Sequence, residues 1–257
     1  MSSISTFRQR LLQREALIGT MLTLPTPAVA EILADTGFDW LFVDGEHGPF
    51  ETNELLAVLQ AVGHRIPCLV RVPESSEVPI KKALDLGAAG IIVPQVNSAE
   101  QAADVVRFAR YAPQGARGVG LARAHGYGRR FREYVAGANE QTVVVVQAEH
   151  IRAVENIEEI VKVPGVDAVL LGPYDLSASL GKMGQLDDPT VVAAIDRITT
   201  VCQAAKMPLG YFNVSAATVQ PFIEKGYTLI TAGVDTILLS QAAGQMLKSL
   251  RPASASQ

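Results

Sequence analysis

The chain has 257 residues, of which 48% are hydrophobic and 19% are charged, and its formal net charge is -4. This is the composition of an ordinary globular protein, and it argues against a disordered or fibrous chain. The mild acidity excludes the strongly basic surface with which proteins bind nucleic acid or anionic membranes, so a small-molecule partner is expected.

The two cysteines and the N-terminal residues indicate the cellular compartment of the protein. Cys68 and Cys202 lie far apart, and neither belongs to a CxxC or Cys/His pattern, so neither a disulfide framework nor a zinc site is indicated. Residues 1–19 lack the apolar stretch of a secretory signal, and no run of about 18 apolar residues could span a membrane. We therefore expect a cytoplasmic protein with reduced cysteines.

The chain begins with a short helical pattern over about residues 4–14, and eight β-rich apolar runs follow it. Helical patterns with apolar residues at three- and four-residue spacing separate most of these runs, and this alternation predicts βαβ units and a parallel sheet. Eight such units favour a single-domain (β/α)8 TIM barrel over an open doubly wound sheet. Residues 252–257 are predicted to form a disordered tail. The apolar runs are residues 16–22, 39–44, 67–72, 90–95, 142–147, 166–172, 208–212 and 228–233.

The longest gap between predicted strands contains the Gly- and Arg-rich segment 111–131. We expect it on the strand-to-helix side of the barrel, where it would be either a wall or lid of the site or a flexible surface loop. Its GARGVG has the spacing G-x-x-G-x-G and does not join a strand to a helix, so a dinucleotide site is not predicted.

Polar residues at the ends of the predicted strands are the candidate site residues, because catalytic groups of such barrels lie there. Glu149 and Asp175 would make an oxygen-rich site for a hard divalent cation such as Mg²⁺ or Mn²⁺, which could polarise a carbonyl and stabilise an enolate. Alternatively, each acid caps the helix that follows it or lies in water. The full set is Asp44, Glu46, His47, Arg71, Gln95, Gln147, Glu149, His150 and Asp175.

Side-chain alternation along residues 142–150 separates Glu149 from His150. Residues 143, 145, 147 and 149 share one face of the strand, and 144, 146, 148 and 150 share the other. The small apolar set Val144, Val146 and Ala148 suits a surface packed under helices. Glu149 is therefore predicted to point into the barrel and His150 outward.

Three further residues are candidates for the site. Arg71 either forms a structural ion pair with an acid or binds an anionic substrate group. His47 follows a strand and lies between Glu46 and Gly48, where a base that titrates near neutral pH would be useful. Asp85 falls in the last turn of a predicted helix, where its charge opposes the helix dipole, so it is either an exposed acid or has a tertiary partner such as His47.

Several motifs in order resemble the HpcH/HpaI aldolase family of metal-dependent pyruvate aldolases, from about Leu17 to about Met246. The most specific are DGEHGP, GAAGIIVPQV and GPYDLSASLG. The resemblance, to 4-hydroxy-2-oxoheptanedioate and 2-dehydro-3-deoxyglucarate aldolases among others, implies a carbon-carbon lyase. Its members cleave a 4-hydroxy-2-oxo acid reversibly to pyruvate and an aldehyde through a metal-stabilised pyruvate enolate. A divalent metal cation (Mg²⁺, Mn²⁺ or Co²⁺) is implied, and a Schiff-base lysine is not.

Matched motif by motif, the resemblance places the family's metal ligands on Glu149 and Asp175 and its catalytic base on His47. The carboxylate partner of that base falls on Asp85, and the enolate-stabilising arginine falls on Arg71.

The resemblance also assigns substrate contacts, to Gln147 and to the backbone N–H at Tyr174. Two residues depart from the usual pattern: Tyr174 stands where a small residue is common, and His150 stands where a hydroxyl residue is common. The implied assembly is a homohexamer, a trimer of dimers in which the C-terminal helix is exchanged between subunits. Alternative hypotheses are a CoA-ester lyase of the citrate-lyase or malyl-CoA-lyase type and a ligand-binding barrel without catalysis.

Overall fold

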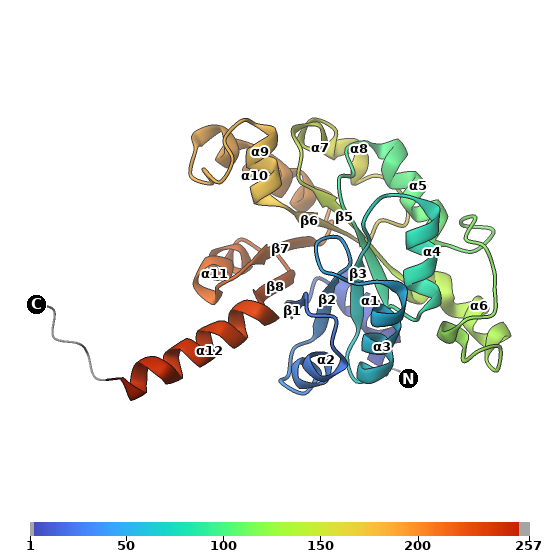
Figure 1. Ribbon diagram of the computed structural model, residues 1–257. Coiled ribbons are helices and arrows are strands. Elements are labelled where there is room, and N and C mark those ends of the chain that lie inside the picture. Colours follow the sequence, from blue (N-terminus) through green and yellow to red (C-terminus); the bar gives the residue numbers. More distant parts are fainter. Residues whose placement is uncertain (1–2, 252–257) are drawn as a thin grey trace, which may run out of the picture.

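Eight parallel strands close into one barrel in sequence order, β1 to β8, and helices surround it (Figure 1). The computed structural model of the chain describes residues 3–251, so the predicted tail lies outside the described residues. Every predicted strand is present, and the predicted (β/α)8 fold is confirmed. The strands are Leu17–Leu22, Trp40–Asp44, Cys68–Arg71, Gly90–Val93, Val143–Ala148, Ala168–Leu171, Leu209–Asn213 and Leu229–Val234.

The helices follow the strands in the order expected of βα units. Among the helices in the described part of the chain, none is long and apolar enough to cross a membrane. The helices are α1 Ser3–Leu12, α2 Pro27–Ala34, α3 Thr52–Val62, α4 Glu77–Asp85, α5 Ala99–Ala109, α6 Phe131–Gln141, α7 Ile151–Glu155, α8 Ile157–Ile160, α9 Pro173–Ser179, α10 Pro189–Ala204, α11 Ala216–Glu224 and α12 Asp235–Leu250, with a 3-10 turn at Arg123–His125.

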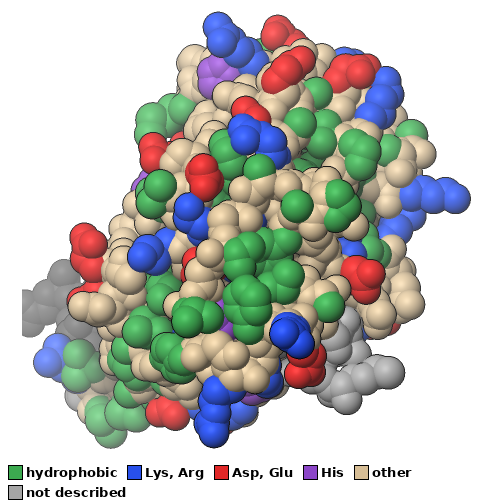
Figure 2. All heavy atoms as spheres, turned by 90° about the vertical axis from the view of Figure 1, so that its right-hand side faces the viewer, with side chains coloured by type: hydrophobic (Ala, Val, Ile, Leu, Met, Phe, Trp, Pro, Cys, Tyr) green, Lys and Arg blue, Asp and Glu red, His purple; other side chains and the backbone are tan. Residues whose placement is uncertain are grey.

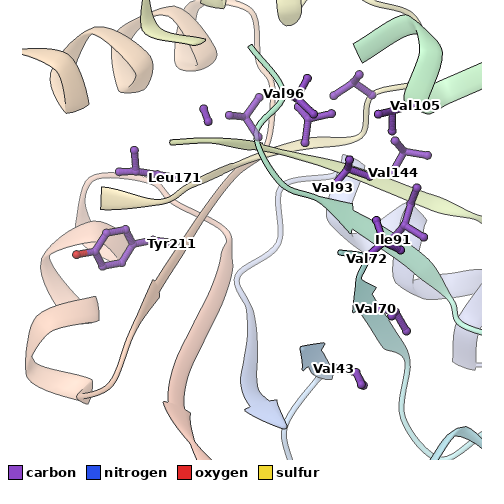
Figure 3. Close-up of a cluster of buried hydrophobic side chains, with 14 of the residues drawn as sticks. Val43, Val70, Val72, Ile91, Val93, Val96, Val105, Val144, Leu171 and Tyr211 are labelled. Carbon is purple, nitrogen blue, oxygen red and sulfur yellow. The ribbon is translucent and has the colours of Figure 1, made fainter. Parts of the chain in front are cut away.

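Side-chain alternation divides the apolar core into two layers. Val144, Val146 and Ala148 of β5 belong to the layer between the strands and the helices, part of which Figure 3 shows. Val143 and Val145 belong to the layer inside the barrel. The predicted orientation of this strand is therefore confirmed, and its inward face continues to residues 147 and 149.

Helix α1 covers the amino-terminal end of the barrel. Phe7 and Leu11 are fully buried in the interior layer, and the Phe7 ring lies 6.4 Å from that of Trp40. Arg8 donates to buried Asp167 at 2.7 Å and fixes the helix there. With one end covered, the carboxyl ends of the strands are left to form a site.

The segment between α5 and α6, residues 110–130, lies at the amino-terminal end of the barrel. The expectation that it belongs to the strand-to-helix side is wrong, because α5 intervenes after β4 and carries the chain back along the barrel. Within this segment Arg123 donates to the carbonyls of Leu86, just after α4, and Leu59, near the end of α3, at 2.7 and 2.8 Å. These bonds anchor the segment to helix ends on the same side.

Helix α12 leaves the barrel and projects away from it (Figure 1). It begins at buried Asp235, whose carboxylate accepts hydrogen bonds from the backbone N–H groups of Thr23 and Leu24 at 2.9 and 2.7 Å. Ile237 still packs partly against the interior layer, and beyond it the apolar residues of the helix are open to solvent; Leu239 is 65% exposed and Leu250 is 75% exposed. An amphipathic helix normally buries such a face, but within one chain that of α12 is left uncovered.

Candidate active site

A polar layer closes the inside of the barrel at the carboxyl ends of the strands. Below it the interior is apolar, and the alternation that places Phe42 inward also places Asp44 inward, two residues later. Asp44 of β2 and Arg71 of β3 are direct partners in the strand register. On β5 the register partner is Val145; Gln147 lies two residues further along the same inward face, and Glu149 follows it. All four polar side chains are buried.

Arg71 is the cation of this layer. It donates to both carboxylate oxygens of Asp44, from Nε at 2.9 Å and from a terminal nitrogen at 2.8 Å, and its Nε lies 3.2 Å from Glu46. Burial by itself would raise the pKa of Asp44, but the hydrogen bonds and charge of Arg71 outweigh it and the pKa is lowered. The ion pair predicted as one interpretation of Arg71 is therefore present, and it holds the guanidinium at the mouth of the barrel.

Glu149 is the buried acid of the layer, with 3% of its surface exposed. Its Oε1 accepts the backbone N–H of Gln95 at 2.8 Å, and its Oε2 accepts from the side-chain amide of Gln147. Burial raises its pKa to about 7; the Gln95 hydrogen bond opposes this rise, and the charges of Asp175 and Glu46 add to it. Burial likewise raises the pKa of Glu46.

The side chain of Glu149 fits beside residue 172 only because that residue is a glycine. A Cβ at position 172 would lie 2.7 Å from both the Cβ and the Oε2 of Glu149, and 3.1 Å from the amide nitrogen of Gln147. No real side chain fits at such distances. Nothing in the sequence singles out Gly172 except that it is a glycine directly at the end of the sixth predicted strand.

Asp175 lies in the first turn of α9, which begins at Pro173. The residue before the helix is Gly172, so Asp175 is not the N-cap that one interpretation required. Its charge acts on both Glu149 and Glu46, which places the three carboxylates around one region. The neighbouring Tyr174 side chain is 60% exposed.

His150 is the N-cap of α7, and its Nδ1 accepts the backbone N–H of Arg152 at 3.1 Å. The capping role that one interpretation gave to Glu149 therefore belongs to His150. The Glu149 carboxylate therefore does not cap α7 and faces the interior of the barrel mouth, as the side-chain alternation predicts.

His47 and Asp85 are not brought together within one chain. His47 follows β2 at the mouth; its side chain is 70% exposed, and its Nε2 lies 3.7 Å from Glu46. Asp85 ends α4, which runs back from the mouth, and it accepts a 2.6 Å hydrogen bond from Arg117. Within a single subunit, His47 is therefore not the partner of Asp85.

The residues at the mouth fit a divalent cation. Glu149 and Asp175 offer carboxylate oxygens, which are the preferred ligands of hard cations. The Oε1 of Gln147 is buried and, among the described residues, has no hydrogen-bond partner. A carboxylate whose pKa is raised by burial and, to a smaller extent, by neighbouring carboxylates would be stabilised in its charged form by a cation. No group of three or more His, Cys, Asp or Glu in metal-binding geometry occurs in residues 3–251, so water or substrate oxygens would have to complete the coordination.

Comparison with known proteins gives one consistent result. Residues 18–242 match the family model described as HpcH/HpaI aldolase/citrate lyase. The chain is 42% identical over 243 residues to a 4-hydroxy-2-oxovalerate aldolase of Rhodococcus jostii (strain RHA1), covering 93% of each chain. It is 40% identical to a hydroxypyruvate/pyruvate aldolase of Cupriavidus necator, covering 95% of this chain and 92% of that one.

A solved structure agrees with these sequence relatives. The crystal structure of an HpcH/HpaI aldolase/citrate lyase family protein from Burkholderia cenocepacia J2315 superimposes with a TM-score of 0.92 at 36% identity, covering 96% of this chain and all of that one.

Proposed function

Because the chain belongs to the HpcH/HpaI aldolase/citrate lyase family, we propose that it is a divalent-metal-dependent aldolase that cleaves a 4-hydroxy-2-oxo acid reversibly to pyruvate and an aldehyde. The observation that carries the proposal is the grouping of buried Glu149 with Asp175, Glu46 and Arg71 at the carboxyl end of the barrel. A metal-binding acid pair beside a fixed guanidinium suits the stabilisation of an enolate oxyanion.

Glu149 and Asp175 would hold the cation, which is expected to be Mg²⁺, Mn²⁺ or Co²⁺. When bound, the cation supplies a Lewis acid and positive charge next to the 2-oxo acid. Gln147, whose Oε1 has no partner among the described residues, would contact the substrate. The backbone N–H at Tyr174 would donate to its carboxylate, because the residue lies in the first turn of α9.

Arg71 and His47 would carry the remaining chemistry. Arg71 is already oriented by Asp44, so its charge can meet a developing oxyanion without reorganisation. His47 stands at the rim beside Glu46 and can move a proton between solvent and the substrate carbon. Neither role needs a Schiff-base lysine.

We propose that Asp85 serves His47 of a second subunit in a homohexamer built as a trimer of dimers. Within one chain, Asp85 and His47 lie at opposite ends of the barrel. The end that carries Asp85 also carries the segment 110–130, in which Val119 is 57% exposed and Leu121 is 78% exposed. Figure 2 views the side of the molecule on which α6 lies in Figure 1, and hydrophobic side chains gather in its lower half.

Exchange of α12 between paired subunits would cover the exposed apolar residues of that helix, including Leu239 and Leu250. In the hexamer, the segment 110–130 of one subunit would then border the site of another. Both cysteines are free and buried, which accords with a cytoplasmic protein.

Proton exchange of pyruvate in deuterated water tests the proposed function. We expect exchange of the methyl protons that depends on added Mg²⁺, Mn²⁺ or Co²⁺, stops with EDTA, and is lost in Glu149→Gln. Glu155→Gln, which changes an exposed acid of α7, is the control and should exchange normally. Absence of exchange with all three metals would overturn the proposal. If a CoA ester were cleaved instead, the chain would be a CoA-ester lyase.

A further inference from the structure

Helix α9 carries Asp175, one of the two acids proposed to hold the cation, but it has only seven residues, Pro173–Ser179. A helix of this length is not stable by itself, so contacts with the rest of the chain must fix its position. Two serines of the helix, Ser177 and Ser179, make such contacts through their hydroxyl groups. The position of Asp175 therefore depends on bonds that α9 makes with its neighbours.

The hydroxyl group of Ser179 joins α9 to the segment that follows β5. It donates to the carbonyl of Leu176 at 2.7 Å, within its own helix, and accepts the backbone N–H of Ile151 at 3.0 Å. Ile151 is the first residue of α7 and lies two residues after Glu149. The bond therefore connects the helix of Asp175 to the segment that carries the other proposed ligand.

The N–H of Ile151 needs an acceptor from outside α7, because the first N–H groups of a helix have no partner within it. In α7, the N–H of Arg152 is bonded by the N-cap residue His150 at 3.1 Å, and the N–H of Ile151 is bonded by Ser179. Loss of the hydroxyl group would leave a partly buried N–H without its acceptor, which is unfavourable. The bond thus stabilises the start of α7 as well as the position of α9.

The pairing of β5 with β6 ends before the two acids. Its last register pair is Ala148 with Leu171, and one further bond joins the N–H of Gly172 to the carbonyl of Ala148 at 3.2 Å. Beyond that point, within the described part of the chain, residues 149–155 and α9 share a single hydrogen bond, the one that Ser179 accepts. The hydroxyl group of Ser179 is therefore the hydrogen-bonded link between the two segments past the end of the sheet.

The side of α9 on which this bond lies is also the side of Asp175. Asp175 and Ser179 are four residues apart, so they share one face of the helix, and the charge of Asp175 acts on Glu149. Ser177 makes the same kind of bond in another direction, because its hydroxyl accepts the N–H of Gly184 at 2.9 Å in the loop after α9. Of the two serines, only Ser179 bonds to the segment of Glu149.

We propose that Ser179 is a positioning residue of the metal site, whose hydroxyl group sets the separation between the carboxylates of Glu149 and Asp175. This inference rests on the proposed function and concerns how its metal ligands are held. Without the hydroxyl group, α9 would be free to shift relative to the end of β5, and the two carboxylates would no longer be arranged in advance for one cation. Groups that orient metal ligands typically contribute about 10- to 100-fold to metal affinity.

Titration calorimetry with Mn²⁺ on Ser179→Ala tests the inference without reference to catalysis. We expect Ser179→Ala to bind Mn²⁺ about tenfold or more weakly than the wild type, and Ser179→Thr, which keeps a hydroxyl group, to recover most of the affinity. The matched control is Ser249→Ala in α12, since the Ser249 hydroxyl donates only to the carbonyl of Met246 in its own helix, at 2.7 Å. Equal Mn²⁺ affinities of Ser179→Ala and the wild type would overturn the inference.

Ser177→Ala separates the positioning of Asp175 from a general loosening of α9. Each alanine variant removes one hydrogen bond that α9 makes with another segment, so both should lower the Tm measured in EDTA. Only Ser179→Ala should also weaken Mn²⁺ binding. If both variants bound Mn²⁺ equally weakly, the site would require only that α9 be stably folded, and the specific role of Ser179 would be refuted.

Pyruvate exchange measured over a range of Mn²⁺ concentrations separates this inference from the proposed function. Ser179→Ala should need about tenfold or more Mn²⁺ for half-maximal exchange and should approach the wild-type rate once Mn²⁺ is saturating. A wild-type protein that binds Mn²⁺ but exchanges no methyl protons would refute the aldolase alone. Equal Mn²⁺ requirements of the wild type and Ser179→Ala would refute only the role of Ser179.

Discussion

Arg117 donates a 2.6 Å hydrogen bond to Asp85 at the end of the barrel opposite to His47. The guanidinium is fully buried and stacks over the Tyr111 ring, 4.6 Å from its centroid, while the Asp85 side chain remains 24% exposed. Asp85 is thus held in place by a rigid cation and still reachable from outside. Such an arrangement suits a carboxylate presented to another subunit.

Subunit complementation tests this arrangement. His47→Ala and Asp85→Ala should each lose most pyruvate exchange, since each breaks every site of its own homo-oligomer. When the two variants are co-expressed, up to about a quarter of the sites should regain both residues by random assortment of subunits. Activity should therefore return in the mixture. A mixture as inactive as its parents would show that Asp85 does not act across subunits.

Gly172→Ala should weaken metal binding without unfolding the barrel. The added methyl would lie 2.7 Å from Glu149 and must push the carboxylate or the β6–α9 turn aside. Loss of ligand orientation typically costs about 10- to 100-fold in metal affinity. Titration calorimetry with Mn²⁺ measures the metal affinity. The control is Gly244→Ala, whose added methyl would have no atom within 4 Å. Equal affinities for the two variants would contradict the packing argument.

The metal-free protein should lose stability as the pH rises through 7. The folded pKa of Glu149 is raised to about 7 from an ordinary 4.5, so folding favours the protonated carboxyl. That stabilisation is complete below pH 4.5 and disappears as the pH passes the folded value, a change on the order of 3 kcal/mol for a shift of this size. The Tm measured in EDTA should fall between pH 5 and 8 more steeply than that of Glu149→Gln.

Added Mn²⁺ should reverse this loss above pH 7, because it binds the ionised carboxylate in the folded state. If the wild-type protein and Glu149→Gln showed parallel Tm curves in EDTA, then Glu149 would not titrate in this range.

The strands and the inward-facing residues could be predicted because both depend on local alternation. The four valines make both faces of β5 apolar, and the alternation of Ala148 with Gln147 and Glu149 indicates which face turns into the barrel. Two helices have no clear helical pattern in the sequence. Helix α6 has a single buried residue, Ala138, and contains Gly137, so its apolar periodicity is weak. Helix α2 has only eight residues and begins at a proline, so it is too short to show such a periodicity.

Long-range relationships were beyond local reasoning. The partner of Asp85 is Arg117, 32 residues further on, and only the packed position of the segment 110–130 reveals it. The need for glycine at 172 depends on its distance to Glu149 on another strand. Gln95 was named for its side chain, but its contribution is a backbone N–H, made in a positive-φ conformation at 54°.

Charges on α12 should break the assembly without unfolding the barrel. Among the described residues of this helix only Asp235 is buried, so Leu239→Glu with Leu250→Glu removes nothing from the core of a single chain. If α12 packs on a partner, the double variant should sediment as a smaller species with unchanged circular dichroism, while Gln245→Glu keeps the assembly. Identical sedimentation of all three proteins would refute exchange of this helix.

Arg71→Lys should reduce pyruvate exchange by about 100-fold or more and leave Mn²⁺ affinity nearly unchanged. Lysine keeps the charge but cannot bond both oxygens of Asp44 as the guanidinium does, so its position at the mouth is lost, and a misplaced oxyanion donor typically costs 10²- to 10³-fold in rate. Arg197→Lys, at an exposed arginine of α10, is the matched control. Pyruvate exchange measured at saturating Mn²⁺ separates an effect on the exchange rate from an effect on metal binding. Full activity of Arg71→Lys would show that Arg71 is only a structural partner of Asp44.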